Sequence, residues 1–467
     1  MKHFVYSCSF IVMTLLGSTT QLWSQQELSL DNYIKLVKLH HPFVKQAQLQ
    51  VAESDAKLMQ KRGAFDPKLF YNQKEKTFKG TPYYENQKTQ LVVPTLYGVA
   101  LEAQMQQASG AFLNPENTTS GEQLFGLGAS VELGRGILSN PRQTALKQAK
   151  LFTQQAREEN ALTVNSILTT AGHAYLDWYK AYRSYQIFDQ FVANAAFRFE
   201  GVKKRMESGD LAAIDSTEAR IAYNQRRLER ENAHLNYRKK TLEVSNFIWL
   251  DNQPMELGDE VQPRFDAEQF LVRFTPDSLP LENHPKLRAL AFKRNRLVLE
   301  KRLQRANLLP QISLQYQWLS NNSPTAQLNY ALDPDNSTTG IKAAFPLFLR
   351  KERANLKLAT LKTTDVEWEQ AQTRLRLQNK IQALYVAKER LKKQERLAQE
   401  MVADYQLLFE GEQKKFAAGE SSLFLVNTRE SRLISALLKA VELSVAQKKA
   451  TLDYYYALQF PALETTQ

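Results

Sequence analysis

His41-Pro42 is followed twenty-five residues later by Pro67, and His284-Pro285 is followed twenty-five residues later by Pro310. The two copies of this pattern lie 243 positions apart. Nearby residue types agree at the same offset: Lys45 with Arg288, Ala47 with Leu290, and Leu69 with Ile312. Agreement of this kind at a fixed offset indicates that the chain is a duplicated unit.

A long stretch without proline follows each copy, residues 142–253 in the first half and residues 347–460 in the second. Because proline ends or kinks helices, and average chains carry one about every twenty residues, such runs predict very long helices. Gly209 and Gly419 interrupt these runs, and each is a helix stop followed by polar capping residues. Each run is therefore predicted to be a helical hairpin.

The two arms of each predicted hairpin differ in length. An outgoing arm of about 70 residues is about 100 Å long, more than three times the thickness of a bilayer core. The returning arms hold about 40 residues and are therefore shorter, since a helix rises 1.5 Å per residue. Helix-like segments at roughly 30–62 and 285–306 precede each strand region. One of these stacked end to end on a returning arm would match the long helix beside it.

Apolar residues at alternating spacings of three and four predict a coiled-coil seam along each long helix. In the first half the seam consists of Leu168, Ala171, Tyr175, Trp178, Tyr182, Tyr185, Asp189, Val192, Ala196 and Phe199. In the second half it consists of Leu384, Ala387, Leu391, Gln394, Ala398, Met401, Tyr405 and Leu408. We interpret both stripes as core packing.

The stretches between each anchor and its long helix follow a period of two, which is typical of strands with one apolar and one polar face. The clearest example is Gln311–Trp318, where Ile312, Leu314, Tyr316 and Trp318 alternate with polar residues. Residues 97–103, 125–133 and 341–345 alternate in the same way. The second half has room for two strands and the first for two to four. Closed bacterial barrels need at least eight strands, so a membrane-spanning version of this chain has to oligomerise.

Composition limits the function further. The basic residues Lys2 and His3, an apolar run from Phe4 to Leu16 and small residues after it predict a secretory signal peptide over 1–24. The only cysteine, Cys8, lies inside that run, so the mature chain is predicted to have neither disulfides nor thiolate metal sites. An excess of 61 basic over 49 acidic residues would suggest nucleic acid in a cytosolic protein, but export argues against that partner. We interpret the excess as the solvated faces of long helices, or as a positive field along a lumen.

The chain resembles the TolC-like outer-membrane efflux protein family over nearly all of its mature length. The resemblance rests on four motifs in the same order: Leu28-Ser-Leu-Asp-Asn-Tyr-Ile before His41-Pro42, Leu308-Leu-Pro-Gln-Ile-Ser-Leu, Phe345-Pro-Leu-Phe, and Phe416-Ala-Ala-Gly-Glu-Ser-Ser-Leu. It implies an α+β, mainly α fold: a long periplasmic α-helical coiled-coil barrel joined to an outer-membrane β-barrel that trimerisation completes.

The resemblance also implies a function, partners and a location. The chain would be the exit duct of a tripartite efflux pump or a type I secretion system in the outer membrane of a Gram-negative bacterium, with a periplasmic extension. Its partners would be two further copies, outer-membrane lipid, a periplasmic adaptor (membrane fusion) protein and an inner-membrane transporter of RND or ABC type, and no cofactor is expected. The resulting segments are a first repeat at 25–250 (strands 67–133, hairpin 141–250), a proline-rich linker at 251–284, and a second repeat at 285–467 (strands 310–346, hairpin 347–460).

Members of the family close the tunnel near the hairpin turns with polar contacts and acidic rings. By position, Asp215 matches the acidic residue after the first turn. The second turn departs from the family, because Asn427 and Glu430 stand where two aspartates are expected. Asp215 has a second interpretation, as a helix cap with Glu218 at its third position.

Both turns are small and polar, and we expect them to be docking points for an adaptor. Their residues are Ser208, Gly209 and Asp210 in the first turn, and Gly419, Glu420, Ser421 and Ser422 in the second. No pattern for a hydrolase, a zinc protease or a dinucleotide loop occurs, so the chain is predicted not to be an enzyme. The alternative to an export duct is a non-conducting, exported coiled-coil scaffold or adaptor of the cell envelope, whose strands would form a soluble sandwich.

Overall fold

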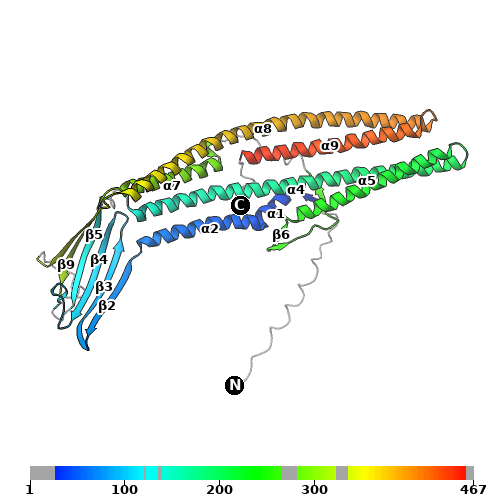
Figure 1. Cartoon of the computed structure of the whole chain (residues 1–467). Coiled ribbons are helices and arrows are strands. Elements are labelled where there is room, and N and C mark those ends of the chain that lie inside the picture. Colours follow the sequence, from blue (N-terminus) through cyan, green and yellow to red (C-terminus); the bar gives the residue numbers. More distant parts are fainter. Residues whose placement is uncertain (1–26, 120–122, 135–138, 266–280, 322–334, 459–467) are drawn as a thin grey trace, which may run out of the picture. The chain divides into compact units, whose positions relative to one another are not determined.

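The computed structural model describes residues 27–119, 123–134, 139–265, 281–321 and 335–458 (Figure 1). The predicted signal peptide lies outside these residues. The chain divides into two compact units. The first, which we call the hairpin unit, contains residues up to Val44, Ser166–Asp277 and Ala383–Tyr456. The second, the sheet unit, contains Lys45–Asn165, Ser278–Gln382 and the chain from Ala457 onward.

A six-stranded antiparallel sheet forms most of the sheet unit, in the order β10-β9-β5-β4-β3-β2. Its strands are β2 (Lys68–Phe78), β3 (Thr81–Pro94), β4 (Val99–Ser109), β5 (Leu124–Gly134), β9 (Gln311–Ser320) and β10 (Ser337–Ala344). Among the described residues, the first repeat therefore contributes four strands to this sheet and the second contributes two. Lys79 and Gly80 join β2 to β3, and both have positive φ angles, as a two-residue type I′ hairpin turn requires.

Helices adjoin the sheet in the same unit. They are α2 (Pro42–Arg62), α7 (Pro285–Ala306) and the first parts of α4 (Pro141–Glu207) and α8 (Arg350–Ala417). The carbonyl of Ser54 in α2 accepts a hydrogen bond from Thr153 in α4, and the carbonyl of Arg296 in α7 accepts one from Gln148 in α4. The short helices that the sequence predicts before each strand region are thus confirmed, except that the first is divided into α1 (Leu30–His40) and α2.

Both predicted helical hairpins are present. The outgoing arms α4 and α8 contain 67 and 68 residues, and the returning arms α5 (Ala213–Ser245) and α9 (Leu423–Ala457) contain 33 and 35. Short elements accompany them in the hairpin unit: strands β1 (Glu27–Ser29), β6 (Trp249–Leu250), β7 (Gln253–Pro254) and β8 (Gln262–Arg264). Three short 3₁₀ helices, η1 (Gly63–Phe65), η2 (Pro115–Asn117) and η3 (Leu281–Asn283), complete the described elements.

The core of the hairpin unit begins with aromatic residues of α4. Tyr175 and Trp178 are fully buried, and the Tyr175 hydroxyl donates to the carbonyls of Leu28 and Arg264, which lie on the paired strands β1 and β8. Trp178 Nε1 donates to Thr241 Oγ1 of α5 over 2.9 Å. The first predicted seam is therefore buried where it starts, since Leu168 and Ala171 are buried too.

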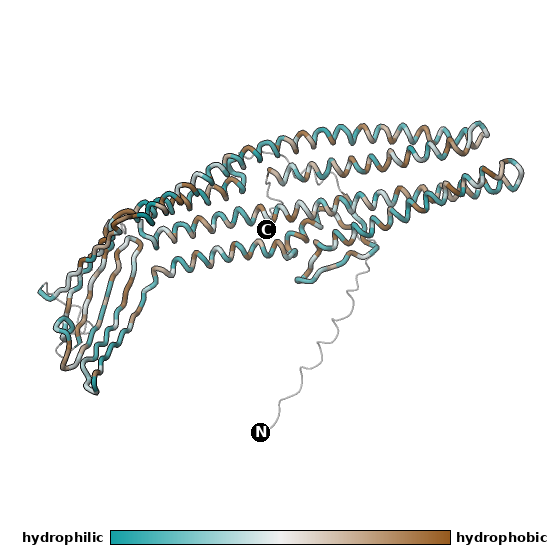
Figure 2. Tube along the Cα trace, in the orientation of Figure 1, coloured by the Kyte–Doolittle hydropathy of each residue, from teal (hydrophilic) through white to brown (hydrophobic). Residues whose placement is uncertain are grey.

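The second predicted seam is partly wrong. Ala398 is buried as expected, but Met401 and Leu408 are about half exposed, and Phe409 is the buried residue instead. Phe409 joins a cluster with Ile187 and Phe191 of α4. The apolar residues of α8 outnumber those that one chain covers, so spacing alone could not identify the buried ones. Hydrophobic and hydrophilic residues intermingle along all four long arms (Figure 2).

None of the described helices contains a segment that is long and apolar enough to cross a membrane.

Candidate functional site

The two hairpin turns have the same backbone structure. In the first, Gly209 N–H donates to the Met206 carbonyl and Asp210 N–H donates to the Arg205 carbonyl. In the second, Gly419 and Glu420 make the equivalent bonds, to Phe416 and Lys415. These pairs form Schellman motifs, and each glycine has the positive φ angle that the motif needs, 84° and 79°. The predicted helix stops are confirmed, and Ser208, Asp210 and Glu420 are exposed.

The second turn is tied to both of its helices by side chains. Ser421 Oγ donates to Glu412 Oε1 of α8 over 2.5 Å, and Arg429 Nε of α9 lies 3.5 Å from Glu412 Oε2. The Ser421 hydrogen bond, helped by the Arg429 guanidinium, lowers the pKa of the Glu412 carboxyl. Ser422 accepts from the Leu425 N–H as the cap of α9. Glu412 and Arg429 are contacts that the sequence did not single out.

Glu430, one of the three candidate gate residues, is buried within a single chain. Only 1% of it is exposed, and it forms ion pairs with Arg198 of α4 and with Arg226 of α5, the latter over 3.1 Å. Arg226 also donates to Ser431 over 2.6 Å and contacts Glu229 over 2.8 Å. The ion cluster of Arg198, Arg226 and Glu430 therefore joins α4, α5 and α9. Sequence reasoning named Glu430 and missed both arginines.

The other two gate candidates lie on the same two short arms. Asn427 Nδ2 donates to Glu218 Oε1 of α5 over 3.3 Å, and its Oδ1 is buried without a hydrogen-bond partner. Asp215 is the acidic residue in the first turn of α5. The alternative interpretation of Asp215 as a helix cap is wrong: the N-cap of α5 is Ala212, which makes no side-chain cap bond, and Asp215 is the third helical residue. Its carboxylate still lies close to the positive end of the helix dipole.

The sheet has two chemically different faces. The β9–β5–β4 register places the apolar residues of each strand side by side: Ile312, Leu314, Tyr316 and Trp318 next to Leu133, Val131, Ala129 and Leu127, and these next to Val99, Leu101 and Ala103. The opposite face carries glutamines, serines and glutamates. The alternation predicted for these strands is thus confirmed. The tip of the β2–β3 hairpin, by contrast with these strands, is hydrophilic (Figure 2).

Glu102 is the centre of the polar face. Its Oε1 accepts from Ser130 over 2.6 Å, and its Oε2 accepts from Gln90, Gln315 and Gln317 over 2.9–3.2 Å. These bonds connect four strands, β3, β4, β5 and β9. Gly128 makes room for the network, because a Cβ there would lie 2.0 Å from the Tyr316 carbonyl oxygen and 2.6 Å from Gln317 Cγ.

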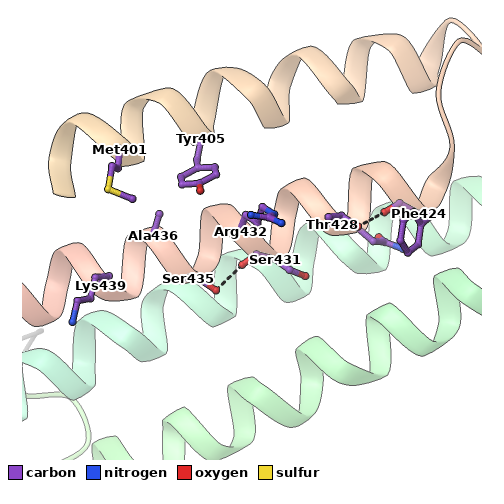
Figure 3. A pocket seen from close by; sticks show the side chains of 10 residues that line it. Met401, Tyr405, Phe424, Thr428, Ser431, Arg432, Ser435, Ala436 and Lys439 are labelled. Carbon is purple, nitrogen blue, oxygen red and sulfur yellow. Dashed lines mark hydrogen bonds between the residues drawn. The ribbon is translucent and has the colours of Figure 1, made fainter. Parts of the chain in front are cut away.

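An open groove runs between α8 and α9 in the hairpin unit. Figure 3 shows Met401 and Tyr405 of α8 facing Arg432 and Ala436 of α9, and Lys439 also lies along its wall. Its lining mixes apolar and basic side chains. Over the part of the chain that the structure describes, histidine, cysteine and carboxylate side chains form no cluster of three that could hold a metal ion.

Comparison with known proteins gives a match to one family model over part of the chain, and a similar fold over nearly all of it. Residues 278–458 match the family model described as "Outer membrane efflux protein". The fold is similar to that of the open-state MtrE outer membrane channel of Neisseria gonorrhoeae, with 15% sequence identity, a TM-score of 0.65, and coverage of 94% of this chain and 90% of that one. It is also similar to the CmeC outer membrane channel of Campylobacter jejuni, with 14% identity, a TM-score of 0.63, and coverage of 94% and 87%.

A third similar structure is the outer membrane protein VceC of Vibrio cholerae, with 13% identity, a TM-score of 0.63, and coverage of 92% of this chain and 96% of that one. A comparison with curated protein sequences found no match. At these identities the solved structures establish a common fold along nearly the whole chain.

Proposed function

We propose that this chain is an outer membrane efflux protein and forms a conducting duct across the outer membrane, because residues 278–458 match that family model and the fold is similar to that of outer membrane channels. It would act as the exit of a tripartite efflux pump or a type I secretion system. The observation that carries this proposal is the six-stranded sheet with one apolar face and one polar face.

The strands are long enough to cross a membrane. Its strands contain 8–14 residues, and a tilted strand needs about 9–11 to cross a bilayer. The apolar face would contact lipid. The polar face, with the Glu102 network, would line a water-filled lumen.

The edges of the sheet support a trimer. In the described residues β10 and β2 are the edge strands, and an open edge in lipid leaves backbone groups unpaired at several kcal/mol each. Because neighbouring strands are antiparallel and each chain has an even number of them, β10 of one copy can pair with β2 of the next without breaking the alternation. Three copies would give about eighteen strands, a size at which barrels contain an aqueous channel.

The hairpins would extend into the periplasm. An arm of 67 residues is about 100 Å long, far longer than the bilayer is thick. The two turns would be the parts that a periplasmic adaptor and an inner-membrane transporter of RND or ABC type can reach. The residues Asp215, Asn427 and Glu430, beside these turns, would help to hold the narrow end closed.

The function is tested by reconstitution. We expect the mature protein to fractionate with outer membranes, to purify in detergent as a trimer, and to conduct ions in planar lipid bilayers. Glu102→Lys should shift the ion preference toward anions, because it reverses a charge on the lumen face. Glu116→Lys, outside the strands on the η2 turn, is the matched control. Recovery as a soluble monomer without detergent would refute the duct and favour the envelope scaffold.

A further inference from the structure

The lysines of the strands at the two edges of the sheet all lie on one face. Strands β2, β3 and β10 carry five of them: Lys68, Lys74, Lys76, Lys88 and Lys342. Successive residues of a strand point to opposite faces, so the three lysines of β2, at even-numbered positions, share a face. Lys88 is directly opposite Asn72 and therefore lies on that face too. The irregularity in the β2–β3 pairing comes after Lys76 and does not change this alternation.

This face is the one that carries the Glu102 network. Lys88 is two residues before Gln90, whose side chain donates to Glu102 over 3.1 Å. Gln315 also donates to Glu102, over 2.9 Å, and its partner residue on β10 lies two positions before Lys342. All five lysines therefore lie on the polar face, which the proposed function turns toward the lumen.

The glutamates of the β2–β3 hairpin lie on the other face. Glu75 and Glu85 are directly opposite each other, an arrangement of like charges that is destabilising. Hydrogen bonds from Gln73 and Gln87 to Glu85, over 2.9 and 2.7 Å, offset part of this cost. Charges on an edge strand prevent wrong strand pairing whichever face they occupy. Protection of the edge therefore explains why charges are present, but not why they are separated by sign.

The positive charge on the polar face is not neutralised within the chain. On the described strands this face carries the five lysines and two carboxylates, Glu102 and Glu132. Glu102 already accepts four hydrogen bonds from uncharged groups. Lys88 is partly exposed, and the other four lysines are exposed. Among the described residues no carboxylate forms an ion pair with any of the five, and the Lys76 ammonium instead lies 4.9 Å from the centre of the Tyr83 ring.

Three of the lysines are close enough to bind one solute together. Lys74 and Lys76 are two positions apart on β2, which separates their Cα atoms by about 7 Å. Lys74 and Lys88 are diagonal neighbours across the β2–β3 pair, at about 7–8 Å. A lysine side chain is a flexible stem that ends in a compact point charge, and it binds carboxylate and phosphate groups without a fixed geometry.

We propose that the five lysines form an anion track in the lumen, and that the cargo of the duct carries two or more carboxylate, sulfonate or phosphate groups. The proposal rests on the trimer of the proposed function. Pairing of β10 with β2 of the next copy would bring Lys342 to the strand beside Lys74 and Lys76, so the ring would carry one track at each joint between copies. A positive wall raises the local concentration of anions and speeds their entry.

Ion selectivity of the mature trimer in planar lipid bilayers tests the track. The reversal potential in a gradient of KCl near 0.1 M, where screening extends over about 10 Å, should show a preference for chloride over potassium. Citrate, a trivalent anion, should block the current more strongly than spermidine, a trivalent cation. The combined variant Lys74→Gln, Lys76→Gln and Lys88→Gln should lower the preference for chloride and weaken the block by citrate about tenfold.

Two matched controls accompany this variant. Lys74→Arg, Lys76→Arg and Lys88→Arg together keep the charge and should keep both the preference and the block. Glu75→Gln with Glu85→Gln changes the charge on the other face of the same hairpin and should leave both unchanged.

Three outcomes would overturn the anion track. One is a stronger block of the unsubstituted trimer by spermidine than by citrate, a comparison that needs no variant to fold. Another is a glutamine variant that conducts with the original selectivity and block. The third is a change caused by the glutamate variant alone, which would place the other face toward the lumen. Absence of conductance from the unsubstituted trimer would refute the duct itself, and is thereby distinguished from conduction without a preference for anions.

Discussion

Glu430 lies on the apolar side of α9, in a column with Leu423, Val426 and Leu433 that packs toward the other helices. That spacing predicts a buried carboxylate, since positions three and four apart share one face of a helix. The sequence could not reveal its partners, because Arg198 and Arg226 are more than 200 positions away along the chain. A buried carboxylate must be paired, and two arginines from two different helices supply the pairs.

At the residue scale, replacing Glu430 should be costly. Glu430→Gln would leave Arg198 and Arg226 buried without their counter-charge, and loss of one partner from a buried pair typically costs about 3–5 kcal/mol. We expect a clear fall in the denaturant midpoint of the detergent-purified protein. Asp189→Asn, which removes the exposed partner of Arg230, should change it little. Equal effects of the two variants would show that the ion cluster does not stabilise the fold.

At the element scale, the repeated His-Pro pair is a pair of helix starts. His41 Nδ1 accepts from the Phe43 N–H over 3.3 Å at the start of α2, and His284 Nδ1 accepts from the Lys286 N–H over 3.1 Å at the start of α7. Nδ1 of each ring must be unprotonated to accept this hydrogen bond. The duplicated anchor that reveals the repeat is therefore a capping device, which the sequence located without indicating how it works.

Burial lowers the pKa of both histidines, although hydrogen bonds with the backbone of Asn246 and of Ala457 act in the opposite direction. The rings of Phe43, Phe247 and Trp249 surround His41, and Lys286 and Lys380 further lower the pKa of His284. With a folded-state pKa below the unfolded value of about 6.5, the unfolded chain binds more protons. The contribution of the two neutral histidines to folding stability is fully present above the unfolded pKa. It is lost as the pH falls from the unfolded pKa toward the folded pKa.

The melting midpoint should therefore decrease as the pH falls below about 6.5. Asparagine also caps helices but does not titrate. His41→Asn combined with His284→Asn should keep most of the stability at pH 7.5 and flatten this part of the pH profile. His40→Asn, at the last residue of α1, is the control and should leave the profile unchanged. A double variant with the wild-type slope would contradict this account.

At the scale of the whole molecule, periodicity predicted most of the fold. The hairpins, the strands that alternate and the glycine turns follow from local rules of spacing and backbone geometry. The number of strands in the first repeat did not follow, because the middle of β2 is a run of polar residues, Asn72–Lys76, in which neither face is apolar. The buried side of α8 did not follow either, because apolar residues occur on two of its faces and only one is covered within the chain.

The turns make a prediction about assembly with partners. Asp210→Trp and Glu420→Trp place a bulky side chain at exposed positions and leave the two positive-φ glycines in place, so the trimer should still form while export is lost. In-cell cross-linking from Ser208 or Ser422 to the cognate adaptor is the direct measurement. Cross-links that come only from the middle of α4 or α8 would show that docking has been assigned to the wrong part of the hairpins.

The ion pair of Asp177 on α4 with Lys449 on α9 makes the contact between the two hairpins of one chain sensitive to ionic strength. Added salt screens this partly exposed pair. Strongly excluded salts such as sulfate instead strengthen the apolar contacts next to it, those of Leu176 with Val445 and Leu452. The choice of electrolyte would thereby decide how firmly the two hairpins of one chain hold together when the helices are forced apart.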